Sequence, residues 1–170
     1  DRLEKIVEEV RRLADELIRH VERNVREVEK AVRESIEHVR DVAEKVERAV
    51  RELEKREGSE DLDRELDRVR REIEELLKRN KDRITRVVDK SRRSSEENKR
   101  ELKKVEDEVE RRGISEEVRK ELKRVIREVE KVNKESNDVT RKVKEESEKV
   151  LKEVEKRLRE VIRRVKEKIR

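Results

Sequence analysis

The sequence contains no cysteine, proline, methionine, phenylalanine, tyrosine or tryptophan, and only two glycines among its 170 residues. Without cysteine there can be no disulfide, no thiol nucleophile and no thiolate metal site, so the redox compartment cannot be inferred. Aromatic rings bury large apolar areas, and natural domains of this size almost always contain several. The composition therefore departs strongly from that of natural globular domains.

Long apolar runs and an excess of one charge are also missing. No stretch is long enough to cross a bilayer and no signal peptide is recognisable, so we expect a soluble chain without a membrane partner. The formal net charge is +5, but 53 basic residues are intermixed with 48 acidic residues along the chain. This mixture forms no basic stripe, and we expect no nucleic-acid partner.

What the sequence does contain is a helical repeat of apolar residues. Charged residues make up 59% of the chain and hydrophobic residues 29%, a composition that raises the question of disorder. The apolar residues nevertheless recur at helical spacing from Leu3 to Ile169, with charges on the faces between them. The pattern predicts an all-α protein of long helices around a thin core.

The two glycines divide the chain into three helices. Gly58 and Gly113 are expected in the left-handed conformation that closes a helix, followed by Ser59 and Ser115 as caps of the next helix. Ile114 is expected to contact Val109. The predicted helices cover about 1–57, 60–112 and 116–170, with loops at 58–59 and 113–115. Short loops make neighbouring helices antiparallel, so residues 1–170 are expected to form one up-down-up bundle.

The apolar repeat is 18 residues long, as shown by Leu3, Val21 and Val39. Eighteen residues make five turns of a straight helix, so the three long helices should be nearly straight and untwisted. With its two glycine loops and missing residue types, the chain resembles the designed, single-chain three-helix bundles over its whole length. The resemblance implies a scaffold with no natural activity or natural location, which we expect to be cytoplasmic on recombinant expression.

Polar residues interrupt the apolar stripe at matching levels. From helix geometry, residue i of the first helix lies level with about 117 − i of the second, and residue j of the second with about 227 − j of the third. Two buried clusters are expected, and Thr140 also lies in the stripe. The first cluster contains His20, Asn24, Ser94, Asn98 and Asn133, with Ser91, Ser95, Ser136 and Asn137 at its edge; the second contains Ser35, His38, Asn80 and Ser147.

We interpret these clusters as buried hydrogen-bond networks that fix register and partner identity. An unsatisfied buried hydroxyl or amide costs about 1–3 kcal/mol, so such groups are expected where they complete one another's hydrogen bonds. The alternatives are exposed positions at the edge of the stripe, or a ligand role.

The two histidines point to neither a metal site nor a catalytic site. His20 and His38 are 18 residues apart on one helix, which separates them by about 27 Å. Each lacks the further ligands of a zinc site, and no orienting acid accompanies His20 and Ser94 as in a catalytic triad. We therefore predict no enzyme activity, no metal and no cofactor. Buried neutral histidines would make stability fall at acidic pH, a hypothesis of pH response.

The sequence is compatible with three functions. The leading one is a self-contained scaffold that requires no partner. The second is a component of a homo- or hetero-oligomeric helical assembly, because the stripe of the first helix, from His20 and His38 to Ile18 and Ile36, spans about 160°. The third is a natural long-helix protein such as a spacer or a membrane-surface bundle, which the missing aromatic residues and the lack of a basic apolar face disfavour.

Overall fold

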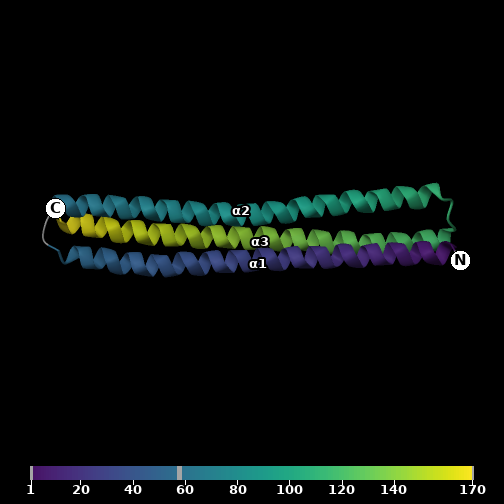
Figure 1. The fold of residues 1–170 in the computed structure, drawn as a ribbon, viewed down its shortest axis with the longest axis horizontal. Coiled ribbons are helices and arrows are strands. Elements are labelled where there is room, and N and C mark those ends of the chain that lie inside the picture. The colour runs from purple at the N-terminus through teal and green to yellow at the C-terminus, as the bar shows by residue number, and fades with distance from the viewer. Residues whose placement is uncertain (1, 57–58, 170) are drawn as a thin grey trace. The chain divides into compact units, whose positions relative to one another are not determined.

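The computed structural model describes residues 2–56 and 59–169, and the side chains of Leu3, Ser59, Glu60 and Ile169 are outside the description. It contains three α-helices, α1 (Arg2–Glu54), α2 (Ser59–Arg111) and α3 (Glu116–Ile169) (Figure 1). No strand occurs in the described ranges. The predicted all-α three-helix bundle is confirmed.

The first connection is only partly described. α1 ends at Glu54, three residues before the predicted end, and a turn follows in which the backbone amides of Lys55 and Arg56 donate to the carbonyls of Glu52 and Leu53 at 3.2 and 3.1 Å. Gly58, together with the capping role predicted for the Ser59 side chain, lies outside the described residues.

The second connection shows why the sequence places a glycine there. Gly113 has a φ of 60°, the left-handed conformation in which a side chain would be strained. Ile114 is buried with Val109 and Leu122 in one core cluster, so the closing turn is anchored by an apolar contact. The carbonyl of Ser115 accepts a 3.0 Å hydrogen bond from the amide of Arg119, which is the first turn of α3.

The chain divides into two compact units, each with segments of all three helices. The first unit consists of Asp1–Glu29 and Val87–Lys142, and the second of Lys30–Arg86 and Val143–Arg170. Each helix contributes one segment to each unit, so each unit has its own core and its own pairing between helices.

Contacts in the first unit define the direction and register of its segments. Asn24 of α1 bonds to Ser94 of α2, and Ser95 of α2 bonds to Asn133 of α3. The two residue numbers add up to 118 in the first pair and 228 in the second, where the sequence-based registers give 117 and 227. Both pairs lie one residue from the registers expected from the sequence. Leu17 clusters with Leu102 and Ile126, and Val10 packs against the cluster of Val109 and Leu122. Residue numbers therefore fall along α2 as they rise along α1 and α3, so α2 is antiparallel to both in this unit.

The second unit has the same pairing. Arg83 of α2 donates a 2.9 Å hydrogen bond to Glu34 of α1, a pair that totals 117. Arg157 of α3 donates a 2.9 Å bond to Glu47 of α1, 110 positions earlier. Further along, Glu54 of α1 pairs with Lys168 of α3, so α1 and α3 run parallel here. Asp67 and Glu74 of α2 pair with Lys166 and Arg159 of α3, so both α1 and α3 run antiparallel to α2.

The core of each unit is narrow and aliphatic. In the first unit Ala14, Leu17, Leu102, Ile126 and Val129 form one buried cluster. In the second unit the least exposed side chains include Val50 and Leu66, both 0% exposed. Without aromatic residues, these aliphatic layers supply the apolar burial that stabilises the bundle.

Candidate functional site

The first unit gathers most of the buried polar side chains. The first polar group contains Asn24 on α1, Ser91, Ser94, Ser95 and Asn98 on α2, and Asn133, Ser136 and Asn137 on α3. Its link between α1 and α2 is a 2.8 Å hydrogen bond from Asn24 Nδ2 to Ser94 Oγ. Both residues are partly buried, which shields this hydrogen bond from competing water.

α2 and α3 are joined more deeply, at Ser95. Its hydroxyl lies within hydrogen-bonding distance of Asn133 Oδ1, and 3.0 Å from Asn137 Oδ1. Because a hydroxyl has one proton, it donates to one of these oxygens at a time. Asn133 Nδ2 returns a 3.3 Å hydrogen bond to the Ser95 carbonyl, and Asn133 is 0% exposed. Ser95 and Asn133 therefore satisfy each other inside the core.

Other members of the first polar group are buried without a cross-helix bond. Ser91, Asn98 and Ser136 are buried, and within the described residues Asn98 Nδ2 has no hydrogen-bond partner. Neighbouring Thr140 donates to the Asn137 carbonyl of its own helix at 3.0 Å. The hydrogen bonds between helices thus involve Asn24, Ser94, Ser95, Asn133 and Asn137.

The second polar group, in the second unit, contains Ser35 on α1, Asn80 on α2 and Ser147 on α3, all buried. Asn80 Nδ2 donates to the Leu76 carbonyl at 2.8 Å, and Ser147 Oγ donates to the Lys144 carbonyl at 2.7 Å. Both acceptors belong to the donor's own helix. Among the described side chains, Ser35 Oγ is buried with no partner. The three residues are buried as predicted, but the hydrogen bonds of Asn80 and Ser147 are local, and the predicted network between the helices stays a prediction.

The histidines correct the sequence-based expectation. His20 and His38 are both exposed, so neither lies inside the polar group to which it was assigned. They occupy the outer edge of the apolar stripe of α1, where the polar imidazole remains in water because burial without a partner is costly. The hypothesis of a pH response required buried imidazoles, and this premise does not hold.

Ser95 and Asn137 make cross-helix bonds, although the sequence placed them only at the edge of the first cluster. The register between α2 and α3 could have identified both residues as members of the hydrogen-bonded cluster. Ser95 lies level with Asn133 within one residue, and Asn137 follows Asn133 by one helical turn.

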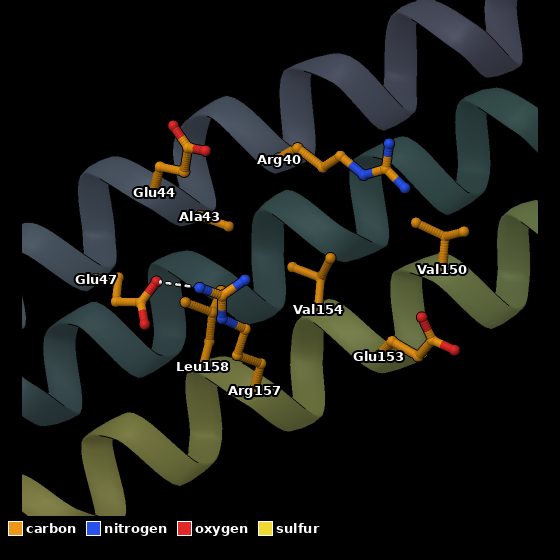
Figure 2. A pocket seen from close by; sticks show the side chains of 9 residues that line it. All are labelled: Arg40, Ala43, Glu44, Glu47, Val150, Glu153, Val154, Arg157 and Leu158. Atoms are coloured by element: carbon orange, nitrogen blue, oxygen red, sulfur yellow. Dashed lines mark hydrogen bonds and ion pairs between the residues drawn. The ribbon is translucent and has the colours of Figure 1, made fainter.

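A groove lined by charged and apolar side chains lies between α1 and α3 in the second unit, with a volume of about 320 Å³. Figure 2 shows the groove, with the ion pair between Glu47 and Arg157 beside Val154 and Leu158.

Among residues 2–56 and 59–169, no three His, Cys, Asp or Glu side chains are grouped so that they could hold a metal ion. In the same ranges, no helix is long and apolar enough to cross a membrane.

One carboxyl group in the second unit has a shifted pKa. Lys166 donates a 2.5 Å hydrogen bond to Asp67 Oδ1, which lowers the pKa of this carboxyl below its ordinary value of 3.8. Partial burial acts in the opposite direction, and the charges of Lys166, Arg70 and Arg71 add to the lowering. The ionised form of Asp67 is therefore favoured in the folded protein.

Replacing Lys166 by methionine is expected to raise the pKa of Asp67 toward 3.8. A depressed folded-state pKa means that Asp67 contributes stability above its unfolded pKa and loses this contribution as the pH falls through the folded value. Carboxyl ¹³C NMR titration measures the pKa directly. Lys168→Met, which removes the same charge near Glu54, should leave Asp67 unchanged; equal shifts in both variants would contradict a specific hydrogen bond.

Comparison with known proteins gives a likeness of fold. No protein-family model matches the chain, and no curated protein matches its sequence. The chain is similar to a solved structure described as "Computationally designed three helix bundle", with a TM-score of 0.49 and 20% identity over 99% of this chain and 84% of the other. Because identity and superposition are both low, neither the origin nor a function of that protein transfers to this chain.

Proposed function

We propose that the chain is a designed structural scaffold whose buried polar residues set the register of its helices. The observation that carries this proposal is the reciprocal bonding of Ser95 and Asn133, both buried and on different helices. A slip of one heptad would move them about 10.5 Å apart along the helix axis. Each buried group would then lose its partner, at a cost of about 1–3 kcal/mol.

The composition supports a designed origin. Seven residue types that natural domains use are absent together, glutamine among them, and the apolar positions keep an 18-residue repeat in which Leu3, Val21 and Val39 are equivalent. Loops built around a single glycine, with serine at the start of the next helix, are the turns that design rules prescribe. The regular pattern of such a sequence is explained by the backbone that it specifies, without a catalytic activity.

The ion pairs between α1 and α3 contribute little to this function. Arg11 pairs with Glu121 in the first unit, and Glu47 pairs with Arg157 in the second. Pairs of this kind contribute about 0–1 kcal/mol each when exposed, so they add little stability. A slip of one heptad would bring Arg11 level with Glu128 and Glu47 level with Arg164, again pairs of opposite charge, so these ion pairs do not select the register and that role is left to the buried polar residues.

The test compares crosslinking of introduced cysteine pairs. Because the chain has no cysteine of its own, only the introduced thiols can react. Arg11→Cys/Glu121→Cys places thiols in register, and Arg11→Cys/Glu128→Cys places them one heptad out of register. Each pair is made in the original chain and in a background with Asn24→Val, Ser94→Ala, Ser95→Ala and Asn133→Leu. A short bismaleimide should link the in-register pair alone in the original chain, and both pairs in the apolar background.

Circular dichroism provides the control, because both backgrounds must be equally helical for the comparison to hold. If the apolar background linked only the in-register pair, as the original chain does, the buried polar residues would not set the register and the proposal would fail.

A further inference from the structure

One stretch of α2 in the first unit contains no hydrophobic residue. Residues 89–101, which we name the polar stretch of α2, lie between the buried Val88 and Leu102 and span about 20 Å of helix. Within the stretch, Ser91, Ser95 and Asn98 are themselves buried. Polar side chains therefore occupy the core face of α2 over this length.

The 18-residue repeat shows what stands at the same places in the second unit. Because eighteen residues make five turns, residues that far apart share one face of a straight helix. Eighteen residues before Ser91, Ser94 and Ser95, α2 carries Ile73, Leu76 and Leu77. Of these three, Ile73 and Leu77 are buried and Leu76 is partly buried. The polar stretch thus has serine where the second unit has aliphatic side chains.

The two helices that pack against the polar stretch keep aliphatic residues. On α1, Val21 and Val28 lie one turn to either side of Asn24, whose hydrogen bond reaches the stretch, and they are 4% and 1% exposed. On α3, Val129 lies one turn before Asn133 and is 0% exposed. At these levels α1 and α3 present apolar side chains to a helix that offers none in return.

Hydrogen bonds replace the missing apolar contacts only in part. Ser94 and Ser95 each bond to a neighbouring helix, but among the described residues the buried Asn98 Nδ2 has no partner. A hydrogen bond in the core replaces one to water, so its net gain is smaller than its strength, and an unpaired buried amide is unfavourable. Burial of an aliphatic side chain is favourable throughout. The polar stretch therefore gains less by packing than its counterpart in the second unit.

We propose that the polar stretch of α2 opens locally while the rest of the bundle stays folded, and that this opening exposes the aliphatic faces of α1 and α3 that it covers. Local openings of lowest free energy occur where buried apolar contacts are fewest. The proposal does not depend on the register-setting role, since it concerns the stability of this segment and not its alignment.

The test is native-state hydrogen exchange of the full chain, followed by NMR, with residues 69–81 as the internal control. The two segments have equal length, and each lies ten residues from its end of α2 (Ser59–Arg111), so fraying affects both alike. After correction for intrinsic rates, amides of the polar stretch should exchange at least about tenfold faster than those of residues 69–81. Equal protection of the two segments would overturn the proposal.

The end of α2 distinguishes local opening from fraying. Residues 102–109 lie nearer to the helix end than the polar stretch does, but Leu102 and Val109 belong to buried core clusters. These residues should therefore exchange more slowly than the polar stretch. Exchange that becomes steadily faster toward Arg111 would show fraying and would contradict local opening.

A pair of identical substitutions locates the cause. Asn98→Leu removes the unpaired amide and adds an aliphatic side chain of similar size, so it should slow exchange in the polar stretch about tenfold and leave residues 69–81 unchanged. Asn80→Leu, the same change in the control segment, should leave the polar stretch unchanged. An equal slowing of both segments in Asn98→Leu would show global stabilisation and overturn the proposal.

Trypsin provides a second, independent measurement. The polar stretch and residues 69–81 each contain five lysine and arginine residues, so they offer the protease equal numbers of sites. Because cleavage requires an opened backbone, mass spectrometry of the native chain should show faster cleavage within the polar stretch than within residues 69–81. Equal or slower cleavage in the polar stretch would count against local opening.

Discussion

Replacing Leu122 by alanine is expected to lower the free energy of unfolding by about 2–5 kcal/mol. Leu122 is 0% exposed and shares a core cluster with Val109 and Ile114. The thin aliphatic core has no aromatic side chain that could move into the space, so the cavity should remain largely open. Guanidinium unfolding followed by circular dichroism measures the change.

Val139→Ala is the matched control for this substitution. It also removes aliphatic atoms from α3 in the first unit, but from a side chain that is 39% exposed. Its effect should lie within about 0.5 kcal/mol, as for most surface substitutions. A loss below about 1 kcal/mol for Leu122→Ala would show that the cluster around Ile114 is not tightly packed.

The second large effect is expected at Asn133, where alanine should cost about 1–3 kcal/mol. The substitution removes the acceptor of the Ser95 hydroxyl and the donor to the Ser95 carbonyl inside the core. Asn137 Oδ1, at 3.0 Å, can still accept from Ser95, which keeps the cost from being larger. Denaturant unfolding of the single variant measures this cost.

A double-mutant cycle separates the hydrogen bond from the loss of volume. Ser95→Ala leaves Asn133 Oδ1 without its donor, and Asn133→Leu leaves the Ser95 hydroxyl with only Asn137 Oδ1 as acceptor, whereas the double variant contains neither of the two side-chain groups. Because replacing both partners can be nearly neutral, the double variant should be more stable than the sum of the two losses by about 0.5–3 kcal/mol. Simple additivity would contradict a direct coupling between these residues.

Much of the fold could be predicted because loops and repeats are strong signals. Two glycines and short connections fix where helices end and therefore which residues lie level with one another. For Asn24 with Ser94, and for Ser95 with Asn133, the expected register was correct to one residue. The sequence could not show the division into two compact units, because the apolar repeat continues through residues 29–30, 86–87 and 142–143.

The candidate site was harder to predict for two physical reasons. The stripe of α1 is so wide that its edge positions are either covered or solvated depending on how the neighbouring helices pack, and His20 and His38 at this edge are exposed. Periodicity also does not determine rotamers. Asn80 and Ser147 point polar atoms at carbonyls of their own helices, which no spacing rule distinguishes from a bond across the core.

The local bonds of Asn80 and Ser147 bear on the order of events in folding. A bond to a carbonyl three or four residues earlier can form as soon as the helical turn exists, within the microsecond formation of a helix. The bonds between Ser95 and Asn133 can form only after α2 and α3 have met. Asn80 and Ser147 of the second unit can thus make these bonds before the helices pack together, whereas Ser95 and Asn133 of the first unit gain theirs only after α2 and α3 have packed.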